Sequence, residues 1–339
     1  MAAGLGFKTF ATGDVLTAGD TNGYLMQGIW VFANATARTA AVTSPQEGNM
    51  SFLKDTNSTE YYDGSAWVAV GGGGAGGINP NIIINGNFTV NQRAYVSAAS
   101  LASGSYGFDR WKSNAAGTAL TFTAAPYGQT ISINSTGGIT QIIEQANVPA
   151  GSYVLSWSGT ATARIYNVGA TPPSYAASPI TFTADGLADV QVDFTASGGT
   201  RTCGLVKLEI GSTPSTFIFA GNTIEGEFAN CQRYYYRNSG GGVYNTYGVG
   251  ISASAGNATI SIPLPTRMRI APTSIDYSNV GITDNVNYQL ALSNLTIDNA
   301  SPSSVTLIAA TGTGQTQYRP AQLTNQNTTS GYIGLSAEL

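Results

Sequence analysis

The chain has 339 residues with a formal net charge of −4, and only 9% of them are charged. This balance provides no basic stripe for nucleic acid, and no apolar run is long enough for insertion into a membrane. The sequence contains no histidine, which excludes Ser-His and Cys-His catalysis and histidine metal sites. Abundant Gly, Ser, Thr and Asn favour many short strands joined by tight turns.

Residues 1–70 are predicted to form a small module. Thr17-Ala18-Gly19-Asp20 resembles a capping box, and Leu25, Met26 and Ile29 would form the apolar side of the short helix that follows. Further elements are expected at Ile29–Phe32 (strand), Thr36–Ala41 (helical turn), Met50–Leu53, Glu60–Tyr62 and Ala66–Val70 (strands). Such a thin sheet is marginal alone and would gain from packing on a partner.

Residues 71–78 are predicted to be a glycine-rich linker, since they contain the run GGGGAGG. Seven residues of this type span roughly 15 Å root-mean-square when free. A phosphate-binding loop would need a following Lys-Ser/Thr and a strand-to-helix context, and neither is present.

Residues 79–220 are predicted to form an antiparallel sandwich. Tyr153, Leu155 and Trp157 alternate with serines, so the strand has one dry and one wet face. The number and spacing of such segments favour a jelly roll. The expected strands are Asn81–Asn85, Ser105–Lys112, Ala119–Ala124, Gln129–Ile133, Ile139–Gln145, Gly151–Trp157, Ala161–Val168, Ile180–Ala184, Ala188–Ala196 and Gly204–Ile210.

Residues 221–237 are predicted to form a helical joint. Asn222 or Thr223 can cap a helix whose first turn carries acids and whose end carries bases, as the helix dipole favours. The expected apolar stripe is Ile224, Phe228, Cys231 and Tyr235, and the expected terminal bases are Arg233 and Arg237. The alternative is a surface helix packed on a single large β-domain.

Residues 238–339 are predicted to form a second β-sandwich. Gly256-Asn257 indicates a hairpin turn between two of its strands. The expected strands are Tyr247–Ser254, Ala258–Leu264, Ser274–Ser278, Tyr288–Leu295, Ser304–Ala310 and Tyr332–Leu339. The whole chain is therefore expected to be mainly β, with one short helix between two sandwiches.

The two cysteines, Cys203 in a predicted strand and Cys231 on the predicted helix, favour buried thiols over a bridge. Two cysteines are also too few for a disulfide framework or a structural zinc site. Whether they pair stays open.

Three blocks of the sequence resemble proteins of tailed bacteriophage particles. The opening block, GFKTFATGDVLTAGDTNGYLMQ with VFANATARTAAVTSPQEGNMSFLKDTNSTEYYDGSAWV, resembles the N-terminal module of phage fibre and minor tail proteins. The middle block, from NIIINGNFTVNQR through FDRWK and QIIEQ to VKLEIGSTPSTF, is similar to carbohydrate-binding-module-like jelly rolls, and EFANCQRYYYR resembles the segment that follows them. The last block, ISIPLPTRMRIAPTSI with GYIGLSAEL, resembles a C-terminal fibre domain.

The resemblance to carbohydrate-binding modules implies a structural calcium ion near Asn85, Asn87 and Glu209. Thr89 stands where an acidic ligand is common in such modules, and calcium sites usually hold several carboxylates. The alternative is that Asn85-Gly86-Asn87 is a turn. No metal or other cofactor is therefore expected.

Catalysis is not expected, because glycosidase chemistry needs two carboxylates facing each other and no spacing singles out a pair. The acids considered are Asp109, Glu144, Asp189, Asp193 and Glu209. Asp109-Arg110-Trp111 and Lys207–Glu209 read as ion pairs or charges at the sheet rim. No nucleotide or flavin motif appears.

Glycan binding is expected from the tyrosines of the last third of the chain. Sugars present flat apolar faces flanked by hydroxyls, which suits an aromatic ring beside an amide or carboxylate. Tyr244 and Tyr247, in a Gly-rich loop, are the predicted host-binding residues. Tyrosine also packs half-buried sheets and subunit seams.

These observations combine into one hypothesis. A phage fibre protein, made in the bacterial cytoplasm and located in the virion, would be held by residues 1–70 to other virion proteins. Its distal β-domains would contact the host surface through glycan, and the resemblance to fibres implies a homotrimer. The alternatives are a purely structural tail or capsid decoration component and a polysaccharide-degrading spike.

Overall fold

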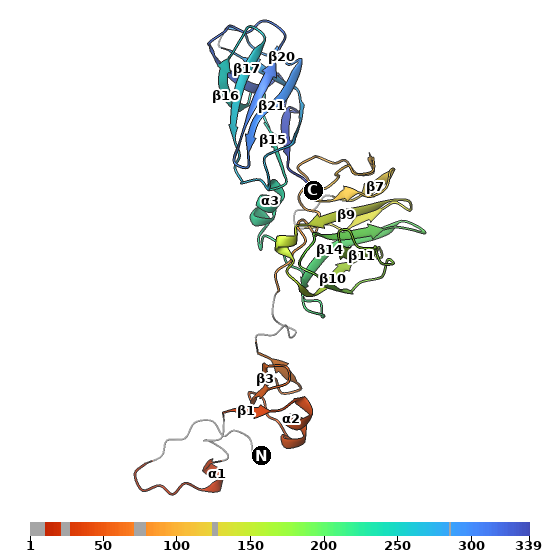
Figure 1. Cartoon of the computed structure of the whole chain (residues 1–339), viewed down its shortest axis with the longest axis vertical. Helices are drawn as coiled ribbons and strands as arrows, with labels where there is room; N and C mark the ends of the chain where they lie inside the picture. The colour runs from red at the N-terminus through yellow and green to blue at the C-terminus, as the bar shows by residue number, and fades with distance from the viewer. Residues whose placement is uncertain (1–10, 22–27, 71–78, 124–127, 285) are drawn as a thin grey trace. The chain divides into compact units, whose positions relative to one another are not determined.

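The computed structural model describes residues 11–21, 28–70, 79–123, 128–284 and 286–339, and it divides into two compact units, Met1–Asn79 and Pro80–Leu339. Strands dominate both units, which confirms a mainly β protein (Figure 1). Within the described ranges, no helix is long and apolar enough to cross a membrane. The expected linker at 71–78 lies outside the described residues.

The first unit is a four-stranded sheet with one covering helix. Thr17 forms the expected capping box with Asp20, but the helix α1 is limited to Ala18–Asp20, and Leu25 and Met26 lie outside the described residues. The other elements match the expected ones closely: β1 Ile29–Phe32, α2 Ala35–Ala41, β2 Met50–Leu53, β3 Ser58–Tyr62 and β4 Trp67–Ala69, in the sheet order β1-β2-β3-β4.

The two faces of this sheet differ in cover. On one face, Arg38 of α2 stacks over Trp67 at 4.5 Å and forms an ion pair with Glu60. On the other face, the register aligns Ile29 with Met50, Tyr61 and Val68 in one row. Ile29, Val31 and Tyr61 are exposed there, so this face of the unit is apolar and uncovered by the described residues.

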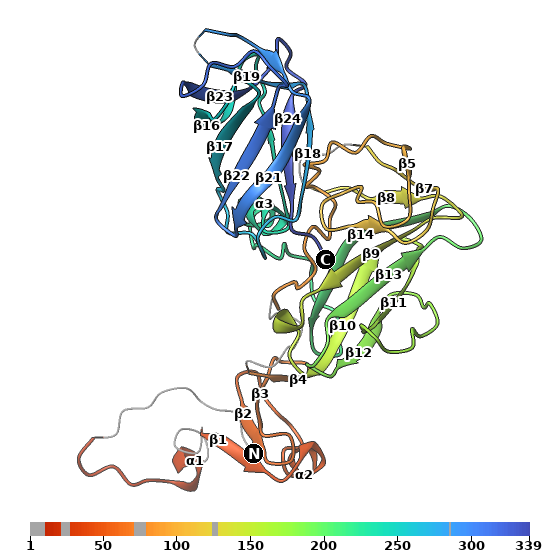
Figure 2. The same ribbon diagram turned by 45° about the horizontal axis from the view of Figure 1, so that its top comes forward.

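The second unit begins with a two-sheet sandwich, seen from a second direction in Figure 2. One sheet has the order β12 Ile180–Ala184, β10 Gly151–Ser158, β14 Arg201–Ile210, β8 Ile131–Ile133, β7 Thr118–Thr121 and β5 Ser100–Leu101. The other has the order β11 Thr162–Asn167, β13 Val190–Thr195, β9 Gly138–Ile143 and β6 Lys112–Ser113. Successive strands from β8 to β14 alternate between the two sheets. A 3₁₀ turn, η2 Gln145–Asn147, lies between β9 and β10.

This alternation and the period-two burial together produce one dry core between the sheets, as the jelly-roll prediction requires. Val190, Val192 and Phe194 of β13 belong to that core, where the Phe194 ring packs edge-on against Trp111 and Trp157. The expected strand at Asn81–Asn85 is instead a turn, because the Asn81 carbonyl oxygen of the side chain accepts from the backbone N–H groups of Ile83 and Leu208. Most of the expected strand Ser105–Lys112 is likewise turns, ahead of β6.

The expected helix is α3, Ile224–Gln232, and the predicted cap Thr223 accepts from the Gly226 N–H at 3.1 Å. The helix ends earlier than 237, because Tyr235–Ser239 forms β15 and pairs with β24, Tyr332–Ser336. Tyr235 and Arg237 therefore lie outside the helix, and the predicted apolar stripe is wrong. The buried side chains of α3 are Glu227, Cys231 and Gln232, whereas Phe228 is exposed.

Two further sheets pack face to face after α3 and enclose a second hydrophobic cluster. The smaller has the order β15, β24 and β18 Ser274–Ser278. The larger has the order β20 Leu290–Ala291, β19 Val280–Thr283, β23 Pro320–Asn325, β16 Thr246–Ser252, β17 Asn257–Pro263, β22 Ser304–Ala310 and β21 Asn294–Ser301. The expected strand Tyr288–Leu295 is thus split between β20 and β21.

Candidate functional site

The two tyrosines predicted to bind the host differ in position. Tyr244 lies in the loop between β15 and β16 and is 52% exposed. Tyr247 is only 6% exposed, because it belongs to the second hydrophobic cluster and its hydroxyl donates to the Asn325 side-chain oxygen of β23. Tyr247 is therefore a packing residue, and the prediction that it contacts a ligand is wrong.

The implied calcium site does not fit the residues present. The Asn85 amide donates to the Val90 and Asp109 carbonyls, and Glu209 accepts from Ser215 and pairs with Lys207 at 3.1 Å. The Asn87 side-chain oxygen is buried without a hydrogen-bond partner, but no group of three or more acidic, Cys or His side chains that could hold a metal occurs among the described residues. Asn85–Asn87 forms the turn that was the alternative interpretation.

Both cysteines are free and buried, as expected. Burial raises the pKa of the Cys203 and Cys231 thiols, so neither is a reactive thiolate at neutral pH. The expected Lys207–Glu209 ion pair is also present, buried on both sides.

A polar and aromatic cluster lies on the outer face of the sheet β11-β13-β9-β6. We call Arg164, Tyr166, Tyr175, Gln191 and Asp193 the sheet-face cluster. The β11–β13 register sets Arg164 opposite Asp193 and Tyr166 opposite Gln191. Tyr175 comes from the segment between β11 and β12, which pairs with β11 through Ala163 and Ala176.

Asp193 is the centre of the sheet-face cluster. Its carboxylate accepts from Arg164 Nε at 2.9 Å, from the Tyr166 hydroxyl at 3.1 Å and from Gln191 Nε2 at 2.8 Å. The Arg164 guanidinium lies 4.5 Å from the Tyr175 ring centre and 5.5 Å from the Tyr166 ring centre. Burial, and then the Asp193 charge, raise the pKa of Tyr166 to about 12, so its hydroxyl remains a donor at neutral pH.

This arrangement holds two half-buried aromatic rings in fixed orientations around a charge-assisted hydrogen-bond network. Side chains fixed in this way lose little conformational entropy when a ligand binds. A sugar could stack on a tyrosine ring and bond to the amide or guanidinium edge. Asp193 is the single carboxylate of the cluster, so the cluster lacks the carboxylate pair of a glycosidase.

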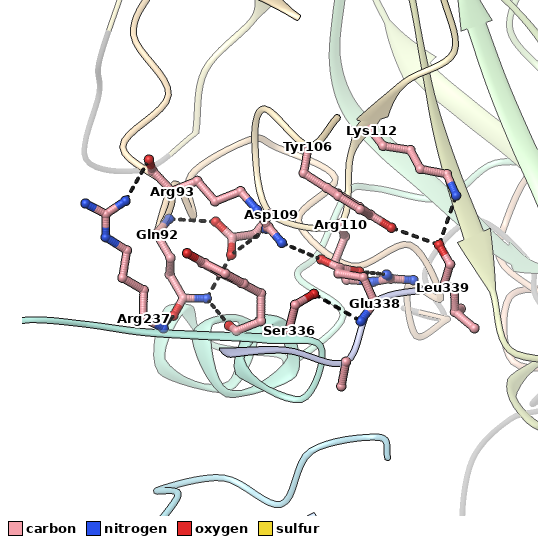
Figure 3. Close-up of polar contacts among 12 residues, drawn as sticks. Gln92, Arg93, Tyr106, Asp109, Arg110, Lys112, Arg237, Ser336, Glu338 and Leu339 are labelled. Atoms are coloured by element: carbon pink, nitrogen blue, oxygen red, sulfur yellow. Dashed lines mark hydrogen bonds and ion pairs between the residues drawn. The ribbon is translucent and has the colours of Figure 1, made fainter. Parts of the chain in front are cut away.

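A second polar network joins the jelly-roll sandwich to the residues that follow the last strand, β24 (Figure 3). Arg110 is fully buried, forms an ion pair with Glu338, donates to the Ile142 carbonyl at 2.5 Å and stacks on Tyr234 at 3.6 Å. Arg93 lies 3.3 Å from Glu338, 3.7 Å from Asp109 and 3.7 Å from the Tyr235 ring centre. We call Arg93, Asp109, Arg110, Tyr234, Tyr235 and Glu338 the inter-sandwich network.

Additional hydrogen bonds between the two sandwiches extend the inter-sandwich network. Gln92 donates to the Asp109 carboxylate and to the Tyr235 carbonyl, at 2.8 and 2.7 Å. The Leu339 carbonyl accepts from the Tyr106 hydroxyl and from Lys112 Nζ, at 3.0 and 2.9 Å (Figure 3). The sandwiches are thus connected by oriented charged groups, as well as by the chain itself through α3.

The comparisons with known proteins leave the family open. No protein-family model and no curated protein matches the sequence. A cycloisomaltooligosaccharide glucanotransferase of Paenibacillus sp. in complex with cycloisomaltoheptaose is similar at 10% identity and a TM-score of 0.20, over 69% of this chain and 46% of that one, less than half of its length. Discoidin II of Dictyostelium discoideum is similar at 10% identity and a TM-score of 0.16, over 73% of this chain and 92% of that one.

Proposed function

We propose that the chain is a glycan-binding component of a tailed-bacteriophage particle and that the sheet-face cluster is its glycan site. The observation that carries the binding proposal is the position of the Arg164 guanidinium near two tyrosine rings while Asp193 holds it in place. The phage assignment rests on the three sequence blocks described above. The protein has no catalytic role in this proposal.

The first unit would attach the chain to other virion proteins. Support comes from its sheet, which is thin and exposes Ile29, Val31 and Tyr61 on the face away from α2. A sheet of this size gains stability when such a face is buried. Labelling the first unit in images of intact particles tests this attachment: a label that is accessible to solvent all around would contradict it.

The glycan site is tested with the full chain on an array of bacterial surface polysaccharides. Tyr175→Ala and Tyr166→Ala should each weaken binding by up to about tenfold, because an aromatic contact contributes about 0.5–1.5 kcal/mol. Tyr166→Phe keeps the ring and should bind more tightly than Tyr166→Ala. Tyr61→Ala, an exposed tyrosine of the other unit, is the control. No binding by the unaltered chain to any polysaccharide would contradict the proposal.

A structural role without receptor binding is the second candidate, and the outer face of the seven-stranded sheet favours it. Val249 and Ile251 of β16 are exposed on that face, next to the uncharged Thr259 and Ser261 of β17. Neutral β-branched surfaces of this kind suit subunit contacts, including those of the homotrimer that the fibre resemblance implies. Light scattering of Val249→Asp against the unaltered chain tests it: an unchanged monomeric mass in both would exclude this contact.

A further inference from the structure

Three loops meet at the end of the seven-stranded sheet where β16 ends and β23 begins, away from α3 (Figure 1). Residues 253–256 follow β16, the described residues 284 and 286–289 follow β19, and residues 311–319 precede β23. The Gln315 N–H donates to the Ala255 carbonyl at 2.9 Å, and Gln317 Nε2 donates to the Ala253 carbonyl at 3.0 Å. The first and third loops are therefore connected.

Asp284 connects the second loop to the third. Its carboxylate accepts from the backbone N–H groups of Asn287 and Val286, at 2.8 and 3.1 Å, and from the Thr316 N–H at 2.6 Å. The side chain is fully buried. Although burial favours the neutral form, these hydrogen bonds lower the pKa of Asp284, so the carboxylate is ionised at neutral pH. The three backbone N–H groups compensate the charge of the carboxylate, which is buried away from solvent.

The largest side chains that these loops present to solvent are two tyrosines and an arginine, beside the smaller exposed Val286, Thr313 and Gln317. Tyr288 is 74% exposed and Tyr318 is 76% exposed, and Arg319 is also exposed. In the described part of the chain, Arg319 forms no ion pair. Tyrosine and arginine, with tryptophan, are the residue types enriched among those that dominate binding energy at protein interfaces.

We propose that Tyr288, Tyr318 and Arg319 form a second glycan-binding site, which takes anionic saccharides bearing carboxylate or phosphate groups. The choice of a saccharide rests on the proposed glycan-binding function, while the site and the charge preference are independent of it. The tyrosine rings offer flat faces for sugar rings. The guanidinium matches a carboxylate or phosphate with two parallel hydrogen bonds.

The charge of the surroundings favours an anionic ligand. Among the described residues of the three loops, Asp284 and Arg319 are the charged ones, and Asp284 is buried and saturated with donors. The exposed charge of this end is thus positive, although the chain as a whole carries a net charge of −4. Attraction to an anion would therefore be local to this end and would weaken with added salt.

The test uses the full chain and three immobilised polysaccharides: polygalacturonate for carboxylate, phosphomannan for phosphate and dextran as the neutral reference. We expect binding to at least one anionic polymer and much weaker binding to dextran. Arg319→Gln should weaken that binding by about tenfold or more, the usual effect of losing a charge-assisted hydrogen bond. Arg267→Gln, which changes another exposed arginine outside these loops, is the matched control.

Tyr288→Ala and Tyr318→Ala should each weaken binding while leaving the thermal unfolding temperature unchanged, because both rings are mostly exposed. Equal losses from Arg319→Gln and Arg267→Gln would show attraction to overall charge and overturn the site. Failure to bind either anionic polymer would overturn the charge preference, as would equal binding to dextran. The Tyr175→Ala variant separates the two sites: loss of all binding in that variant alone would overturn this site and support the sheet-face cluster.

Discussion

The ion pair between Arg110 and Glu338 allows a sharp test of how much the inter-sandwich network contributes to stability. The side chains of Arg110 and Glu338 are 2% and 7% exposed. Glu338→Gln removes the acidic group that, among the described residues, forms an ion pair with Arg110 and also lies 3.3 Å from Arg93. Breaking a buried ion pair from one side usually costs about 3–5 kcal/mol, because the remaining charge stays buried without compensation. Arg110 keeps its bond to the Ile142 carbonyl, its stacking on Tyr234 and, from the new amide oxygen, a neutral acceptor in place of the charged carboxylate.

We therefore expect Glu338→Gln to lower the free energy of unfolding by about 3 kcal/mol or more. The measurement is urea denaturation of the full chain followed by tryptophan fluorescence, since Trp111 lies next to Arg110 and is fully buried. Asp298→Asn, which changes an exposed acid of β21, is the control. The double variant Arg110→Met with Glu338→Leu should recover much of the loss. A loss below about 1 kcal/mol in Glu338→Gln would refute a buried, desolvated ion pair.

Three other predictions concern single positions. Gly86→Ala should destabilise the chain by about 1–3 kcal/mol or more, because a Cβ there would overlap the Val206 carbonyl. Chemical denaturation measures the loss, with Gly242→Ala as the control because a Cβ at that position meets no backbone atom. Burial raises the pKa of Asp109 to about 6, above its usual value in an unfolded chain. The protonated carboxyl therefore contributes up to about 3 kcal/mol to stability below pH of about 4, and this contribution disappears as the pH rises to about 6. The difference in unfolding free energy between the unaltered chain and Asp109→Asn should fall across that range, and a flat difference would contradict the shift. Cys203 should react with a thiol reagent only after denaturant is added, and reaction in the folded chain would show that it is accessible.

Most of the strands follow from the alternation of dry and wet residues. β12, β18 and β22 have the expected bounds, since each has a regular period and clear turns on both sides. β23 begins with Pro320 and lacks a clear period, and its pairing with β16 and β19 decides its structure. At Tyr235, helical spacing continues from α3, but pairing with β24 some hundred residues later, Tyr235 with Ser336, makes a strand. The local periodicity of a sequence does not reveal a pairing partner so far away in the chain.

The sites were less predictable because each depends on register. Tyr247 stands in a Gly-rich stretch that favours exposure, yet β16 pairs with β23 and brings its hydroxyl to Asn325. Gln191 and Asp193 are recognisable as the wet side of a strand, but that pattern does not place Arg164 opposite Asp193.

The scarcity of charge in this chain makes the few charged residues informative once pairings are known. Asp193, Glu338 and Asp284 are all buried or nearly so, and each holds together segments that local patterning leaves independent. A buried carboxylate is costly unless donors satisfy it, so each such site fixes the geometry of its neighbours. Replacing Asp284 with Ala should therefore loosen the loops that carry Tyr288 and Tyr318 and speed amide hydrogen exchange there, while exchange in β13 stays unchanged. Equal protection of those loops in the variant would show that they are held without the carboxylate.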